Sequence, residues 1–162
     1  MAPVSVGDLV MEITDLLAPA QVLINRHASD KSRLFDELAR WAAAGLGLPS
    51  ETILTALLKR EELGSTAAGN GIALPHARLS GISKPFVLVA RLNKAIEFDA
   101  IDGVPVDIVC LVLLPEGSEE GQHALACLAR VLRDEDVLRN FRHAANHIEA
   151  YRALLRADEV IE

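Results

Sequence analysis

Aromatic residues, cysteines and long hydrophobic runs are all scarce in this chain of 162 residues. Aromatic residues make up 4% of the sequence and hydrophobic residues 51%, so the core must be built mainly from Ala, Leu, Val and Ile. The longest apolar run, Ile108–Leu114, falls well short of the roughly 20 residues that a membrane-spanning helix needs. The first residues also lack the basic start and the apolar stretch of a signal peptide. We therefore expect no membrane insertion.

Basic residues are few relative to acidic ones. Sixteen Lys and Arg face 23 Asp and Glu, which gives a net charge of −7. Binding to a phosphate backbone draws on clustered Lys and Arg, so this balance argues against a nucleic-acid partner. The two cysteines, Cys110 and Cys127, lie in apolar surroundings and form no C-x-x-C motif. We expect both to be buried, reduced thiols of a cytoplasmic protein.

The length predicts one domain, and a chain of this size can bury a sizeable core without disulfide bonds. Hydrophobic periodicity and capping residues predict helices that begin at Ser29, Pro49–Ser50, Ser118, Val137 and Asn146. Short apolar runs rich in β-branched residues predict strands at 22–24, 86–90 and 107–114, with an edge segment at 96–98; residues 72–74 are a short apolar piece before Pro75. The fold class is therefore α/β, with a small mixed β-sheet and helices packed on both sides. Residues 1–14 are expected to form an extension and residues 15–158 the domain.

One Gly-rich passage, from Arg60 to Arg78, carries the chemistry that the sequence reveals. Its glycines permit tight turns close to a ligand, and its backbone N–H groups can form an anion-binding nest. Arg60 and Arg78 bracket the passage with two planar cations suited to phosphate, and His76 follows Pro75 near its end. Such a histidine can act as a base or as a nucleophile that accepts a phosphoryl group. The candidate phosphoryl-binding residues are Ser65, Thr66, Gly69, Asn70 and Gly71.

Other sequence signals carry less chemistry. No Walker A, kinase or G-x-S-x-G pattern occurs, so a nucleotide is not the obvious phosphoryl donor. His143 and His147 have the spacing of a metal-binding pair, but Asn146 interrupts their helix, and we expect neither a metal nor a cofactor. Acidic pairs such as Glu61–Glu62 are expected to be solvated helix ends.

The passage resembles the active-site signature of the fructose/mannitol-type enzyme IIA family of the bacterial phosphoenolpyruvate:sugar phosphotransferase system. That signature reads approximately R-E-x-x-G-S-T-G-x-G-x-G-x-A-[IL]-P-H-[GA]. The chain departs from it at Ala67, where the family usually has Gly, and at Ala68, where a larger aliphatic residue is usual. The residues that match are Arg60, Glu61, Gly64, Ser65, Thr66, Gly69, Gly71, Ala73, Pro75 and His76.

The resemblance extends over roughly residues 12–157. It includes Lys84–Pro85, the passage from Phe98 to Asp107, and a histidine early in a later helix, His123. Within the family, the chain is most similar to the nitrogen-regulatory branch. The resemblance implies that His76 is phosphorylated by an HPr-like carrier at Nε2. It also implies that Arg60 binds the phosphoryl oxygens and that His123 contacts the bound group.

Three functions related to this family remain open, and a metalloprotein is a fourth alternative. The first is a nitrogen-regulatory IIA protein, a histidine phosphotransferase component whose phosphorylation state regulates partners. The resemblance implies that these partners belong to potassium transport or signalling. The second is a sugar-specific IIA protein that passes the phosphoryl group to a IIB domain. The third is an interaction module that has lost transfer.

Overall fold

The computed structural model describes residues 11–117 and 119–159. Its sheet holds six strands: β1 (Val22–Arg26), β2 (Ala67–Gly69), β3 (Ile72–Ala73), β4 (His76–Leu79), β5 (Phe86–Ile96) and β6 (Val106–Pro115). The order is β1-β5-β6-β3-β2, and β4 also pairs with β6. β5 and β6 are antiparallel, as are β2 and β3, whereas β1 pairs parallel to β5, and β3 and β4 pair parallel to β6. The expected mixed sheet is therefore confirmed.

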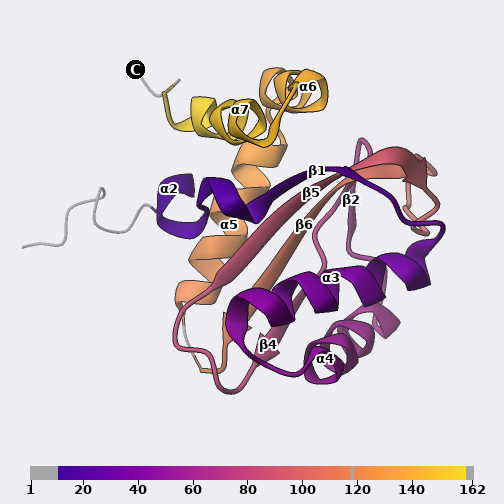
Figure 1. Cartoon of the computed structure of the whole chain (residues 1–162), viewed down its shortest axis with the longest axis vertical. Helices are drawn as coiled ribbons and strands as arrows, with labels where there is room; N and C mark the ends of the chain where they lie inside the picture. Colours follow the sequence, from indigo (N-terminus) through magenta and orange to yellow (C-terminus); the bar gives the residue numbers. More distant parts are fainter. Residues whose placement is uncertain (1–10, 118, 160–162) are drawn as a thin grey trace, which may run out of the picture.

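Helices cover both faces of the sheet (Figure 1). One face carries α3 (Lys31–Leu46) and α4 (Ser50–Glu62). The other carries α2 (Ile13–Leu16), α5 (Glu120–Leu132), α6 (Glu135–His143) and α7 (His147–Glu159), and a short 3-10 turn, η1 (Pro19–Gln21), leads into β1. The α/β architecture with helices on both sides is thus confirmed. The boundary expected at residue 15 falls inside α2, whose Ile13 is 1% exposed; residues 1–10 lie outside the described ones.

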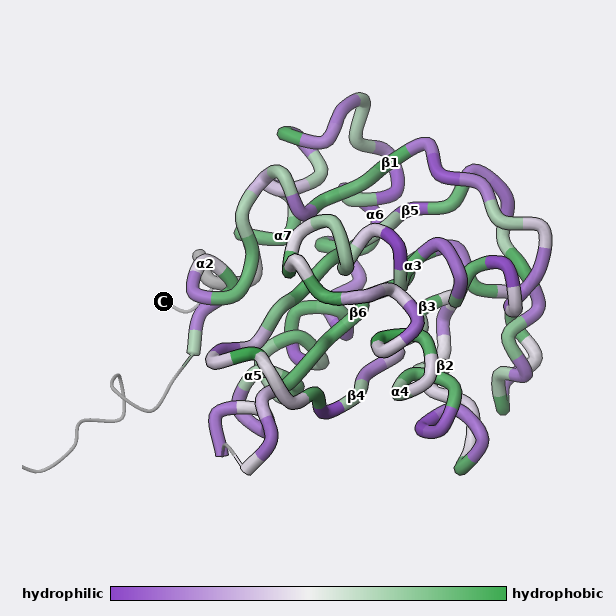
Figure 2. The backbone as a smooth tube through the Cα atoms, turned by 60° about the horizontal axis from the view of Figure 1, so that its bottom comes forward, coloured by the Kyte–Doolittle hydropathy of each residue, from purple (hydrophilic) through white to green (hydrophobic). Residues whose placement is uncertain are grey.

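The side chains of β6 alternate between two core layers, as the period of two along a strand requires. Cys110 and Val112 pack beneath α5 and α7, whereas Val109 and Leu111 pack beneath α3 and α4. Apolar residues therefore follow one another without interruption along β6, and Figure 2 shows the central strands as largely hydrophobic. The structure therefore confirms that β5 and β6 are covered on both faces.

Both cysteines lie within this packing and are buried. Burial, and secondarily the neighbouring Cys127, raises the pKa of the Cys110 thiol above its ordinary value. The two thiols are therefore buried as the sequence predicts. Among the described residues, no helix combines the length and apolar character needed to cross a bilayer.

Local signals explain most of the element bounds, and two of the expected bounds differ from the structure. α3 begins after Asp30, whose carboxylate accepts a hydrogen bond from Arg33 N, and not after Ser29. It ends at Gly47, which adopts the left-handed φ of 70° that favours glycine. β5 continues to Ile96, so the segment expected as a separate edge belongs largely to this strand. The cap expected at Ser118 lies outside the described residues.

Arg91 joins β5 to the C-terminal end of α6. Its Nη1 lies 2.8 Å from the carbonyl oxygen of Phe141, 3.2 Å from that of Arg142 and 2.9 Å from that of Ala144. The last carbonyl groups of a helix have no partner within the helix, and a cation at this end also favours the helix dipole. Arg91 therefore anchors α6 to the sheet.

Replacing Arg91 with Met is expected to lower the free energy of unfolding by about 1–3 kcal/mol, because half-buried carbonyl groups lose their donor. Urea unfolding followed by circular dichroism measures this change. Arg40→Met is the matched control, since the Arg40 side chain is 66% exposed and forms a surface salt bridge of 3.7 Å with Glu37. Equal stability of the two variants would contradict the anchoring role.

Candidate functional site

A hollow of about 600 Å³ lies where the last turns of α4 face the edge strand β4. It brings together three cationic side chains and one imidazole from distant parts of the chain. The residues that form its walls are Thr52, Thr55, Ala56, Lys59, Arg60, Leu63, His76, Ala77, Arg78, Leu79, Ser80 and Glu116. Arg60, His76 and Arg78, which the sequence singles out, therefore meet in one place.

His76 begins β4 and is half-buried. Its Nδ1 lies 2.8 Å from the carbonyl oxygen of Leu74. A carbonyl oxygen only accepts hydrogen bonds, so Nδ1 must carry the hydrogen, and Nε2 of the neutral ring then carries a lone pair. Pro75 stands between the two residues and favours an extended conformation for Leu74. The backbone thus fixes both the tautomer and the orientation of the ring.

Arg60 lies in the last turn of α4 and is half-buried. Its Nη1 donates to the carbonyl oxygen of Gly64 at 3.0 Å. Arg78 lies two residues after His76 on the same strand, and its Nη1 donates to the carbonyl oxygen of Pro115 at 3.3 Å. Backbone acceptors therefore hold both guanidinium groups, and both arginines are among the residues that border the hollow.

The hydroxyl groups of Ser65 and Thr66 are used inside the protein. Ser65 Oγ donates to the carbonyl oxygen of Phe98 at 2.8 Å, and Thr66 Oγ1 donates to Glu61 Oε1 at 2.6 Å. Each hydroxyl has a single hydrogen to donate. The two hydroxyl donors that the sequence suggests for a phosphoryl group are thus engaged in contacts within the loop.

Gly69, Asn70 and Gly71 form the tip of the β2–β3 hairpin, away from His76. Ile72 pairs with Ile108 whereas His76 pairs with Val112. Four residues of β6 separate these levels, which is about 13 Å at roughly 3.3 Å per residue. Asn70 and Gly71 line a different hollow. The tip is therefore not part of the hollow that holds His76.

Acidic and basic side chains fasten this hairpin tip. Asn70 N donates to Asp102 Oδ2 at 2.9 Å, and this bond, with a second from Val104 N, holds the pKa of the Asp102 carboxyl below its ordinary value. Arg142 Nη2 donates to the carbonyl oxygen of Asn70 at 2.7 Å. Gly71 has φ +82°, and a Cβ there would lie 2.7 Å from Arg142 Nη2. Glycine at this position is therefore a packing requirement.

His123 lies in the first turn of α5 and is exposed. The packing of Ala77 and Leu79 beneath α3 and α4 directs the intervening side chains of β4 to the face that α5 covers. His76 and His123 thus belong to the same face of the sheet. Among the described residues, His123 neither lines the hollow nor shares a hydrogen bond with His76.

Glu61 differs from the sequence interpretation, which expected a solvated helix end. Its side chain is only 8% exposed and forms a salt bridge of 2.9 Å with Lys31 Nζ. Its carboxylate also accepts hydrogen bonds from both the N–H and the hydroxyl of Thr66. The expectation was wrong because α4 ends against α3 and the loop. The signal was present, since Glu61 is one of the residues that match the signature.

His143 and His147 lie on different helices, at the end of α6 and the start of α7. Within the described part of the chain, no group of three or more His, Cys, Asp or Glu side chains is arranged to hold a metal ion. His143 Nδ1 instead contacts the carbonyl oxygen of Arg139 at 2.8 Å.

Comparison with known proteins gives a consistent family. A family model described as phosphoenolpyruvate-dependent sugar phosphotransferase system, EIIA 2, matches residues 15–157. A nitrogen regulatory protein of Bradyrhizobium diazoefficiens is 41% identical over 145 residues, covering 89% of this chain and 95% of that protein. A fructose-specific EIIA component of Haloferax volcanii is 34% identical over 132 residues, covering 78% and 86%. The crystal structure of nitrogen regulatory protein IIA-Ntr from Neisseria meningitidis superposes with a TM-score of 0.80 at 28% identity, covering 88% and 98%.

Proposed function

Because the chain belongs to the EIIA 2 family of the phosphoenolpyruvate-dependent sugar phosphotransferase system, we propose that His76 accepts a phosphoryl group on Nε2 from the phosphohistidine of an HPr-like carrier. One observation carries this proposal. The contact of 2.8 Å between Nδ1 and the carbonyl oxygen of Leu74 leaves the lone pair on Nε2, and His76 borders the same hollow as Arg60 and Arg78. The family members are components of a phosphotransferase, so the chain is a transferase component that carries the phosphoryl group.

The transfer needs no separate acid or base. The Nε2 lone pair of His76 attacks the phosphorus while the bond between phosphorus and the carrier's ring nitrogen breaks, and that nitrogen regains its lone pair. The hydrogen on Nδ1 stays on that nitrogen and remains hydrogen-bonded to the carbonyl oxygen of Leu74 throughout. Charge spreads over three equatorial oxygens as the group passes in line between the two rings. The protein's task is therefore to position and stabilise these oxygens.

The cationic residues of the hollow supply that stabilisation. Arg60 is the principal ligand of the phosphoryl oxygens, and Arg78 adds positive charge from the strand that carries the nucleophile. His123 approaches from the α5 side of the sheet and donates a ring N–H to the bound group. This chemistry requires no metal and no cofactor, because a phosphohistidine is already a reactive donor.

The nitrogen-regulatory branch is the favoured assignment. The relative from Bradyrhizobium is named a nitrogen regulatory protein, and it covers nearly the whole of both chains. Phosphorylation of His76 adds a doubly charged group close to Leu63, which is 84% exposed beside the hollow. Target proteins that dock on this surface would therefore distinguish the two forms. Targets in potassium transport or signalling fit this role, and the two buried cysteines fit action in the cytoplasm.

A sugar-specific IIA protein is the second candidate, because the relative from Haloferax volcanii is named a fructose-specific EIIA component. Such a protein would pass its phosphoryl group to a IIB domain. A non-transferring interaction module is the third candidate, and the retention of His76 and Arg60 in one hollow disfavours it.

The test is incubation of the protein with phosphoenolpyruvate, enzyme I and each candidate carrier. We expect a gain of one phosphoryl group that is labile in acid and stable in base, formed faster with the nitrogen-branch carrier. Transfer onward to a sugar-specific IIB domain would instead support the second candidate. If none of the phosphorylated carriers labels the protein, the result would support the interaction module and overturn the proposal.

A further inference from the structure

A continuous series of hydrogen bonds leads from α3 to the ring of His76. Lys31 Nζ lies 2.9 Å from Glu61 Oε2, and Glu61 Oε1 accepts the hydroxyl hydrogen of Thr66 at 2.6 Å. The carbonyl oxygen of Thr66 accepts from Leu74 N at 2.9 Å. The carbonyl oxygen of Leu74 in turn accepts from His76 Nδ1 at 2.8 Å. Each contact fixes the acceptor of the next.

The first half of this series is well protected from water. The Glu61 side chain is 8% exposed, that of Lys31 is 23% exposed, and Thr66 is 7% exposed as a residue. Glu61 binds Thr66 twice, because Oε2 also accepts from Thr66 N at 3.0 Å. Charge-assisted hydrogen bonds with this geometry are among the strongest in proteins.

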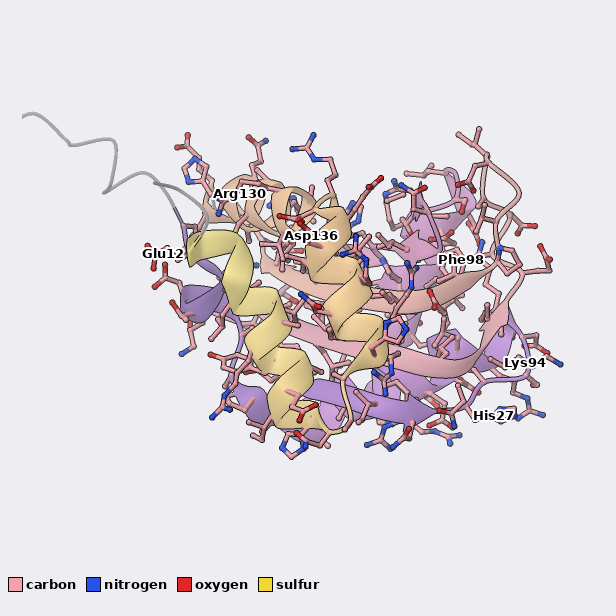
Figure 3. All side chains as sticks on the ribbon, turned by 90° about the horizontal axis from the view of Figure 1, so that it is seen from above. Glu12, His27, Lys94, Phe98, Arg130 and Asp136 are labelled. Carbon is pink, nitrogen blue, oxygen red and sulfur yellow. The ribbon has the colours of Figure 1, made fainter. Side chains whose placement is uncertain are left out.

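Lys31 is fixed from a third direction by the segment after β5. Its Nζ lies 4.5 Å from the ring centroid of Phe98 and 3.3 Å from Asp99 Oδ2. Ser65 Oγ donates to the carbonyl oxygen of the same Phe98. Phe98, His27 and Lys94 lie at one end of the molecule, and Glu12 lies at the opposite end (Figure 3). The start of α3, the end of α4 and the segment after β5 thus converge on the loop before His76.

We propose that Glu61, supported by Lys31, is a positioning residue that sets the tautomer and the orientation of the His76 ring. The proposal rests on the function proposed above, because it gives the series of contacts its purpose. Glu61 holds Thr66, Thr66 holds the backbone of Leu74, and Leu74 holds the proton on Nδ1. The carboxylate therefore touches neither the phosphoryl group nor the carrier, and it acts only through the loop.

The expected effect is on the transfer step. A ring with its hydrogen on Nε2 has no lone pair at the attacking nitrogen, and a displacement of about 1 Å in a reacting group can cost a factor of about 10² in rate. Glu61→Gln keeps the size of the side chain but replaces one acceptor oxygen with an NH2 donor. The variant therefore loses the acceptor for one of the two hydrogen bonds from Thr66. Lys31 still keeps Asp99 as a partner.

The experiment measures single-turnover phosphoryl transfer from a phosphorylated carrier at several carrier concentrations. We expect Glu61→Gln to lower the maximal rate by between ~10-fold and ~100-fold, with little change in the carrier concentration for half-maximal rate. The matched control is Glu62→Gln, on the exposed neighbour, which should stay within about twofold of the wild-type rate. Lys31→Gln should lose less than Glu61→Gln, because the carboxylate keeps its bonds to Thr66.

A second pair of variants tests the same series at its next member. Thr66→Ser keeps the hydroxyl and should transfer at close to the wild-type rate, whereas Thr66→Val removes it and should behave like Glu61→Gln. This comparison also serves if Glu61→Gln does not fold. Failure of Thr66→Ser to exceed Thr66→Val would overturn the proposal.

The readout specific to positioning is the tautomer of His76, read from the ring nitrogen chemical shifts of the unphosphorylated protein by NMR. The wild-type ring should carry its hydrogen on Nδ1, and Glu61→Gln should raise the fraction with hydrogen on Nε2. This measurement needs no carrier, so failure of the wild-type protein to be phosphorylated would contradict the proposed function alone. An unchanged tautomer and rate in both Glu61→Gln and Thr66→Val, or an equal loss in Glu62→Gln, would overturn the positioning role.

Discussion

The variant His76→Ala will take up no phosphoryl group from a phosphorylated carrier. Nε2 of His76 supplies the lone pair that forms the new bond, and Ala leaves the hollow without a nucleophile. We do not expect the hydroxyl groups of Ser65 and Thr66 to replace it, because both are held in loop contacts and Thr66 is only 7% exposed. The measurement is the mass of the intact protein after incubation with phosphoenolpyruvate, enzyme I and the carrier, before and after acid treatment.

The matched control for this loss is His143→Ala. The ring of His143 also contacts a backbone carbonyl oxygen through Nδ1 at 2.8 Å, but it lies at the end of α6 and outside the hollow. We expect this variant to be phosphorylated as fully as the wild-type protein. An acid-stable phosphate on Ser65 or Thr66, or labelling of His76→Ala, would refute the assignment of the nucleophile.

The second large effect is expected for Arg60→Ala, whose rate of phosphoryl transfer should fall by ~10²-fold to ~10³-fold. The guanidinium of Arg60 lines the hollow beside His76 and is held there by the carbonyl oxygen of Gly64. Without it, the charge that develops on the transferring oxygens loses its principal partner. The nucleophile remains, so phosphate still accumulates on His76, only slowly. Rapid-quench measurement of the transfer rate tests this expectation.

Two further variants separate charge from geometry at this position. Arg60→Lys keeps the positive charge but not the planar fork that binds two oxygens at once, so it should recover only part of the lost rate. Arg139→Ala removes an arginine that is 62% exposed and pairs with Asp136 on α6, and it should leave the rate unchanged. A rate for Arg60→Ala equal to that of Arg139→Ala would show that Arg60 does not act on the phosphoryl group.

The sequence predicts the architecture well because its signals are local. Continuous apolar runs identify β5 and β6 as strands covered on both faces. The first and last residues of an element are harder to predict where neighbouring residues offer the same chemistry. Ser29 and Asp30 can both cap a helix, and only the geometry of the chain decides that Asp30 does so.

The candidate site is predicted only in part, because spacing along the chain does not say which contacts a side chain prefers. The sequence brings Arg60 and His76 into one motif, and the structure brings them into one hollow. Ser65 and Thr66 have the chemistry to bind a phosphoryl group, but acceptors on Phe98 and Glu61 engage their hydroxyls. These acceptors come from other elements, and no local pattern reveals them.

The hairpin tip shows that residues close in sequence can lie far apart in space. Gly69, Asn70 and Gly71 are close to His76 in sequence, yet extended strand carries the chain steadily away from a turn. The glycines serve the turn itself and the close approach of Arg142. Glu61 shows the reverse case, because an acidic residue at a helix end is buried when another element supplies a cation.

Both thiols are buried between the sheet and the helices, so the folded chain is suitable for site-specific labelling. Cys110 and Cys127 are the two cysteines of the sequence, and the pKa of Cys110 is raised, so in the folded state it persists as the poorly nucleophilic thiol. A single cysteine introduced at the exposed Leu63 would then react selectively with a maleimide fluorophore. Changes in its emission would report arrival and departure of a docking protein in real time, without removal of any native residue from the core.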